Sequence, residues 1–159
     1  MRAVIRNSGT NQDGRTAGIS MPSGDAQVEL MKSTYKAAGL DPAQNTYVEA
    51  HGTGTPTGDP IEAASLSQFF AQRRSAEQPL TIGSIKSNIG HLEGASGVAA
   101  VLKAVLMLEH EFILPNFDYQ KPSPRIPMDK LNIQVGLLVC IILDNIHHLV
   151  GSYEPSTVG

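Results

Sequence analysis

The sequence predicts a layered α/β domain, because short apolar segments alternate with helical patterns along the chain. A second observation supports this class: two glycine-rich loops, each with one histidine, follow two of the apolar segments. In open α/β sheets, loops at strand ends usually carry the functional site. The length of 159 residues suits one domain, and 41% hydrophobic with 17% charged residues is an ordinary globular composition.

The first predicted pair is a strand followed by a helix. Residues 2–6 alternate polar and apolar side chains, which is typical of a short strand. Residues 7–24 are rich in Gly, Asn, Ser, Thr and Asp and predict a loop. Apolar residues at helical spacing predict a helix over residues 25–38, and Gly39 stands where a C-cap glycine is expected.

The second predicted pair contains the first histidine loop. Residues 47–50 predict a buried strand, and residues 51–58 form a Gly/Thr-rich loop. A helix is expected from Asp59 to about Arg73. Asp59 suits the N-cap, Pro60 follows it, and Glu62 completes a pattern similar to a capping box.

The third predicted pair contains the second histidine loop. Residues 80–85 predict a strand, and residues 86–91 turn out of it. The helix expected over residues 95–109 has little polar face, which predicts that it is buried. A proline-rich extended connector over 116–130 then precedes an edge strand over 131–135.

Charge and cysteine content exclude several classes of function. The net charge is −3 and the charges are interspersed, so the sequence offers no basic patch for nucleic acid. The longest apolar run, near residues 135–143, is too short to span a membrane. Cys140 is the only cysteine, so no internal disulfide can form, which fits a reducing, cytoplasmic setting.

His51 and His91 are the candidate functional residues, because each lies at the exit of a predicted strand. Paired imidazoles can donate hydrogen bonds to a developing oxyanion or enolate, and losing one such donor typically costs roughly a hundred- to a thousand-fold in rate. Lys86 can add positive charge to the same position, and Thr53 and Thr55 offer hydroxyls for a polar chain or an amide. Periodicity and spacing alone do not assign a reaction.

Long motifs carry a family resemblance. Residues 49–55 (EAHGTGT) and 58–63 (GDPIEA) resemble the first histidine motif of β-ketoacyl synthases, and residues 86–97 (KSNIGHLEGASG) resemble the second. Residues 11–15 and 114–116 match as well. The chain is therefore similar to the C-terminal half of the ketosynthase domain of polyketide synthases, with the closest similarity to fungal reducing ones.

The resemblance implies a fold and a division of the chain. The fold is the C-terminal half of a thiolase-like layered α-β-α domain, and it is incomplete. Residues 1–135 form the ketosynthase C-terminal subdomain. Residues 136–159 form an atypical tail that matches no domain, and we expect truncation, a gene fragment or an unspliced intron there.

The resemblance also implies a reaction and partners. The family joins acyl and malonyl thioesters by decarboxylative Claisen condensation on the phosphopantetheine arm of an acyl carrier protein, without another cofactor, and the intact family is homodimeric. It implies that His51 and His91 hold the malonyl thioester carbonyl and stabilise the enolate, and that Lys86 orients His91. Thr53 and Thr55 would bind the phosphopantetheine arm.

The chain departs from the family in its nucleophile. The family's catalytic cysteine belongs to an N-terminal half that has no counterpart here, and the apolar surroundings of Cys140 do not favour a reactive thiolate. We therefore expect no condensation by the isolated chain. The apolar helix over residues 95–108 would lose part of its cover, and an exposed apolar patch of that kind predicts association.

Other interpretations stay open at this point. A lone histidine at a strand end is more often structural, Asp59 and Glu62 can simply cap a helix, and Thr53 and Thr55 can simply form turns. The chain can be a non-catalytic module that binds a carrier protein or a dimer interface, or a pseudogene or mis-spliced product. A metal hydrolase is disfavoured and no metal is expected, because the histidines lack the spacing of a ligand set.

Overall fold

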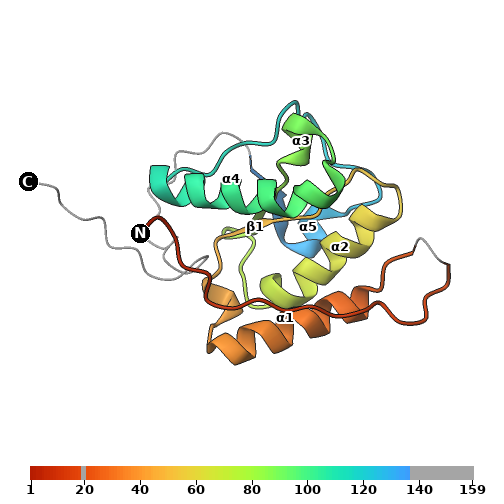
Figure 1. Ribbon diagram of the computed structural model, residues 1–159. Coiled ribbons are helices and arrows are strands. Elements are labelled where there is room, and N and C mark those ends of the chain that lie inside the picture. The colour runs from red at the N-terminus through yellow and green to blue at the C-terminus, as the bar shows by residue number, and fades with distance from the viewer. Residues whose placement is uncertain (19–20, 137–159) are drawn as a thin grey trace, which may run out of the picture.

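The computed structural model describes residues 1–18 and 21–136, and its centre is a small parallel sheet (Figure 1). The strand order is the order of the sequence, with the middle strand paired on both sides. Tyr47 is opposite Thr81, which is in turn opposite Gln134. The strands are β1 (Tyr47–Glu49), β2 (Leu80–Gly83) and β3 (Ile133–Val135). These three were predicted, and β3 is the expected edge strand.

Helices cover both faces of the sheet, so the layered α/β prediction is confirmed (Figure 1). On one face, Leu66 and Phe70 pack with Leu80 and Ile133 in the main core. On the other face, Met107 packs with Tyr47. The longer helical elements are α1 (Gly24–Ala38), α2 (Gly58–Leu66), its π-helical continuation η2 (Ser67–Ala71) and α4 (Ser96–His110). The shorter ones are η1 (Pro42–Gln44), α3 (Lys86–Ile89), η3 (Glu93–Ala95) and α5 (Met128–Leu131).

The ends of α1 follow local rules that the sequence makes visible. The Ser23 hydroxyl accepts a hydrogen bond from the Ala26 N–H, which satisfies one free donor of the first turn. Gly39 adopts the left-handed conformation at the C-cap, where an L side chain would be strained. α1 then packs on α2 and forms an outer layer on that side of the sheet.

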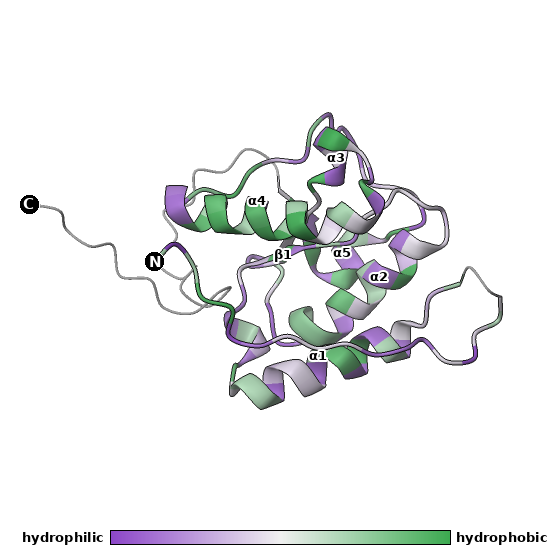
Figure 2. Ribbon diagram, viewed as in Figure 1, coloured by the Kyte–Doolittle hydropathy of each residue, from purple (hydrophilic) through white to green (hydrophobic). Residues whose placement is uncertain are grey.

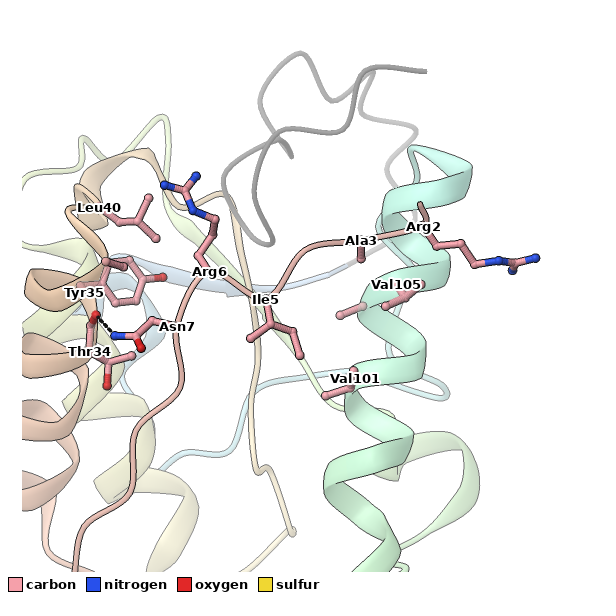
Figure 3. A pocket seen from close by; sticks show the side chains of 12 residues that line it. Arg2, Ala3, Ile5, Arg6, Asn7, Thr34, Tyr35, Leu40, Val101 and Val105 are labelled. Carbon is pink, nitrogen blue, oxygen red and sulfur yellow. Dashed lines mark hydrogen bonds between the residues drawn. The ribbon is translucent and has the colours of Figure 1, made fainter. Parts of the chain in front are cut away.

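The strand predicted over residues 2–6 is wrong. Within the described part of the chain, these residues pair with no strand and run as an irregular segment between α1 and α4. Asn7 donates a hydrogen bond to the Thr34 carbonyl at 2.9 Å, and Ile5 faces Val101 of α4 across an apolar hollow of about 580 Å³ (Figure 3). The segment therefore lies beside two helices and not in a sheet, and its burial does not alternate: Ala3 and Val4 are half-buried, whereas Ile5 is 72% exposed.

The outer face of α4 is apolar and exposed, which corrects the expectation that this helix is buried. Figure 2 shows an apolar helix along the edge of the molecule. Met107 and Lys103 face the sheet and are buried. The outward side chains are exposed by 46% to 63%; they are Val98, Val101, Leu102 and Leu106. The second expectation for this helix, an exposed apolar patch, agrees with these exposures among the described residues.

Two further expectations concern the C-terminal region and the membrane. The connector over 116–130 is irregular as predicted, except that α5 begins near its end. The atypical tail lies outside the described residues from 137 onward. No helix in the described part of the chain is both long and apolar enough to cross a bilayer.

Candidate functional site

The two histidine loops meet at one edge of the sheet. β1 and β2 are parallel neighbours, so the loops that follow them leave the sheet on the same side. The rings of His51 and His91 lie with centroids 5.4 Å apart and with perpendicular planes. This is the juxtaposition that the two strand exits predict. Both side chains are exposed in this chain.

Two carboxylates hold the first histidine loop. Glu62 accepts hydrogen bonds from the backbone N–H groups of His51 at 2.7 Å and Gly52 at 2.9 Å. Asp59 accepts from Gly54 at 3.1 Å and Thr55 at 3.2 Å. Hydrogen bonds to a charged acceptor are stronger than neutral ones. Both acids therefore fix the shape of the loop through backbone donors.

This arrangement corrects the prediction that Asp59 caps the helix. The N-cap position of α2 is Thr57, which makes no side-chain cap hydrogen bond. Asp59 and Glu62 lie in the first turns of α2 and bond to the loop upstream of it. The capping pattern in the sequence marks a helix start correctly to within a residue or two, but the acids serve the loop instead of the helix end.

The two loops approach each other at Gly52. Gly52 has a φ of +47°, and a Cβ built on it would lie 2.8 Å from the Cβ of Ser84 in the loop that follows β2. The Ser84 hydroxyl also donates a hydrogen bond to the His51 carbonyl at 3.4 Å. A side chain at position 52 would thus be strained by its backbone and would push the loops apart.

His91 is held through its Nδ1 atom. The Oγ of Ser96 lies 2.7 Å from this nitrogen, and the Glu93 backbone N–H donates to it at 3.2 Å. Ser96 is buried and is the first residue of α4. Its Oγ also accepts a hydrogen bond from the Leu92 N–H at 2.9 Å. Sequence reasoning missed Ser96, although it belongs to the same motif as His91.

Lys86 and the two threonines have different surroundings. Lys86 begins α3 and lines the same hollow as His91 and Thr53. No hydrogen bond joins Lys86 to His91 among the described residues, so its orienting role stays a prediction. The Thr55 hydroxyl accepts from the Gly58 N–H at 3.1 Å, which is the bond of a turn-forming residue.

The hollow between the loops has a volume of about 410 Å³. One wall is formed by the histidine loops and includes Gly52, Lys86 and His91. The connector that follows α4 forms the other wall, with Tyr119 and Ile126. Burial raises the pKa of the Tyr119 hydroxyl above its ordinary value, so this group remains a neutral hydrogen-bonding partner. The hollow offers both apolar surface and polar groups.

The comparison with known families settles the ancestry of these loops. Residues 2–120 match the family described as "Beta-ketoacyl synthase, C-terminal domain". The chain belongs to this family. The match includes both histidine loops of the ketosynthase domain, with Thr53 and Thr55 in the first of them, and the whole of α4.

Relatives and solved structures agree with this assignment. The chain is 55% identical over 137 residues to the highly reducing polyketide synthase tstA of Talaromyces stipitatus, and 53% identical over 135 residues to Preu1 of Preussia isomera. These alignments cover 86% and 85% of the chain but only 5% and 6% of the relatives. The ketosynthase domain therefore belongs with those of fungal reducing polyketide synthases.

Among solved structures, the fold is similar to the ketosynthase from module 6 of the bacillaene synthase of Bacillus subtilis 168. The TM-score is 0.79 at 39% identity, covering 86% of this chain and 24% of that one. The oxazolomycin ketosynthase domain of Streptomyces albus JA3453 gives 0.77 at 37% identity, with 84% and 24% covered. The chain thus has a thiolase-like fold and spans about a quarter of these ketosynthase chains.

A buried ionic network supports the histidine loops of this ketosynthase domain. Lys103 of α4 donates to Glu49 at 2.7 Å and to the Tyr47 hydroxyl at 2.8 Å, and Tyr47 donates to Glu49. The other oxygen of Glu49 accepts from the Ile85 N–H at 2.6 Å, just before Lys86. One carboxylate therefore connects β1, the start of α3 and α4.

Tyr47 stays protonated in this network. Burial raises the pKa of its hydroxyl most, and the charge and hydrogen bond of Glu49 raise it further. Sequence reasoning missed the network because Lys103 is an isolated lysine in the middle of an apolar stretch of the helix. Its partners lie more than fifty positions away, so no local pattern indicates them.

Proposed function

We propose that the chain supplies the malonyl-activating part of a ketosynthase site. His51 and His91 hold the carbonyl of a malonyl thioester and stabilise the enolate that forms on decarboxylation. The observation that carries this proposal is the pair of imidazoles 5.4 Å apart on two loops that contact at Gly52. Two N–H donors from different loops can meet at one oxygen only if the loops are fixed in this way.

The proposed chemistry needs little from the protein except positioned donors. The bond between the carboxylate carbon and the α-carbon of malonate breaks, carbon dioxide leaves, and the electron pair spreads onto the thioester oxygen. Imidazole N–H groups of His51 and His91 stabilise that charge. In the complete reaction, the α-carbon then attacks an acyl-cysteine thioester and the thiolate leaves. We expect no counterpart of that cysteine in this chain, because the apolar sequence around Cys140, its single cysteine, does not favour a reactive thiolate.

The surroundings of the two rings support the view that another part of a synthase completes the site. Hydrogen bonds to a developing charge are worth most where water is excluded, and both imidazoles are exposed here. Thr53 and Lys86 line the hollow beside His91, which supports binding of the phosphopantetheine arm of an acyl carrier protein there. The pairing of β3 with β2 supports a subdomain that extends through Val135.

The exposed face of α4 favours a second candidate function, a non-catalytic binding module within a polyketide synthase assembly. Its outward valines and leucines are the kind of surface that a partner or a second subunit covers. Such a module would act in the cytoplasm, as the single cysteine suggests. The two functions differ in their dependence on the histidines.

The deciding experiment gives the purified chain a malonyl-loaded carrier protein and an acyl donor. We expect slow release of carbon dioxide that requires His51 and His91, and no β-ketoacyl product. His110→Gln is the matched control, because His110 is an exposed histidine at the far end of α4. Product that survives Cys140→Ala but requires both histidines would overturn the proposed absence of a nucleophile. Decarboxylation that is equal in all variants would favour the binding module.

A further inference from the structure

We infer that Ser96 is a positioning residue that fixes the tautomer and the ring plane of His91. The inference rests on the proposed function in one respect, since it matters for catalysis only if His91 is a hydrogen-bond donor to the substrate. The geometry itself is independent of that role. Ser96 Oγ lies 2.7 Å from His91 Nδ1, which is the shorter of the two contacts to that nitrogen.

The direction of each hydrogen bond follows from the donors that surround it. The Glu93 backbone N–H can only donate, so His91 Nδ1 is an acceptor at 3.2 Å. The Leu92 N–H likewise can only donate, and it donates to Ser96 Oγ at 2.9 Å. The serine hydroxyl then donates its own hydrogen to His91 Nδ1. All three contacts agree on one assignment, in which Nδ1 carries no hydrogen.

The consequence concerns the other ring nitrogen. A neutral imidazole whose Nδ1 is an acceptor carries its hydrogen on Nε2. Nε2–H is therefore the donor of His91, and it is the atom left to point away from Ser96 toward a substrate. Two donors on one nitrogen also restrict rotation of the ring, and the ring plane is perpendicular to that of His51.

Ser96 is well placed to act as a rigid support. It is only 5% exposed, and it begins α4, which packs on the sheet through Met107. Lys103 of the same helix is bonded to Glu49, two residues before His51. The side chain that fixes His91 is thus tied to the strand that leads to His51. Loss of the Ser96 hydroxyl leaves only the longer contact from Glu93, so the ring gains a second tautomer and more rotational freedom.

The test is nitrogen NMR of the histidine rings in the full chain, labelled with ¹⁵N-histidine. Magic-angle spinning suits a chain that associates. We expect the wild-type His91 signals, assigned by their absence in His91→Gln, to show a non-protonated Nδ1 and a protonated Nε2. In Ser96→Ala, we expect a fraction of molecules with protonated Nδ1. Ser65→Ala is the control, because Ser65 is an equally buried serine that bonds to the Ile61 carbonyl.

Two outcomes overturn the inference. A protonated Nδ1 on His91 of the wild-type chain would contradict it even if Ser96→Ala failed to fold. Unchanged His91 signals in Ser96→Ala would contradict it as well. Ser96→Thr, which keeps the hydroxyl, should retain the wild-type signals.

The rate of malonyl decarboxylation separates this inference from the proposed function. Ser96→Ala should lower the maximal rate by roughly tenfold with little change in the apparent affinity for the carrier, less than the roughly hundred-fold loss expected in His91→Gln. If His91→Gln has no effect, the proposed function fails. If His91→Gln removes activity while Ser96→Ala retains all of it, the positioning role fails and the proposed function stands.

Discussion

The edge of the sheet that carries the histidines differs from the outer face of α4 in how many of its contacts come from this chain. At the histidine edge, Glu62 and Ser96 each hold a loop by hydrogen bonds from within the chain. On the outer face of α4, Val98 and Leu102 remain more than half exposed. The comparison teaches that hydrogen bonds within this chain hold the loops of the site, whereas the outward side chains of α4 have little cover from the residues that the structure describes.

The largest expected effect comes from the buried network that connects the two regions. Lys103→Met leaves the Glu49 carboxylate buried without its cation, and we expect a loss of about 3–5 kcal/mol in the free energy of unfolding. Denaturant titration measures it. The control is Arg2→Met, which removes an exposed ion pair with Glu109 and should cost less than about 1 kcal/mol. Equal losses in the free energy of unfolding of the two variants would show that the buried network does not hold the histidine edge and α4 together.

The next effect concerns the contact between the histidine loops. Gly52→Ala adds a methyl group at a positive φ and 2.8 Å from Ser84, so we expect a loss of about 1–3 kcal/mol in stability and a lower decarboxylation rate. Gly94→Ala is the matched control, because its added Cβ meets nothing within 4 Å. A Gly52→Ala chain with wild-type stability and rate would mean that the loops need no close approach.

A smaller effect is expected at alkaline pH on the side of the sheet opposite α4. Burial raises the pKa of Tyr35 to about 12, so the folded chain keeps a proton that the unfolded chain loses above pH 10. The contribution is fully present below pH 10 and falls as the pH rises toward 12, by at most about 1.4 kcal/mol per pH unit. Tyr35→Phe should flatten this part of a stability profile measured by denaturant titration. An identical slope in the variant would refute the assignment.

The smallest effect on stability is expected on the exposed face of α4. Replacing Val98 and Leu102 by Ser and Gln should change the free energy of unfolding by less than about 0.5 kcal/mol per site, since neither side chain is buried. The same variant should associate much less in sedimentation velocity, because it removes part of an apolar patch. Undiminished association would show that another surface brings the chains together.

The sequence predicts the regular elements better than their contacts. The helix over 25–38, its Gly39 cap and the strands of the sheet follow from short-range patterns, and the structure contains them. The strand predicted over residues 2–6 is wrong because a pattern of five residues carries little information, and the segment lies beside α1 and α4 instead of joining the sheet. The apolar composition of α4 predicts a buried helix, but composition alone does not show which of its side chains are covered.

The candidate site shows the same division between local and tertiary information. His51, His91, Lys86 and the threonines are visible as motifs, and the structure places the two histidine rings together. The roles of Asp59 and Glu62 in holding the loop were not predicted, because a capping pattern and a loop scaffold use the same residues at the same spacing. Ser96 and Lys103 become visible only when the partners of their polar atoms are known.

The central claim is that His51 and His91 act together on a malonyl thioester, and release of carbon dioxide from malonyl-loaded carrier protein tests it most directly. We predict that His51→Gln and His91→Gln each lower the rate by roughly a hundred-fold or more, and that the double variant is little slower than either, because both donors serve one oxygen. A double variant that releases carbon dioxide at the wild-type rate would contradict the account.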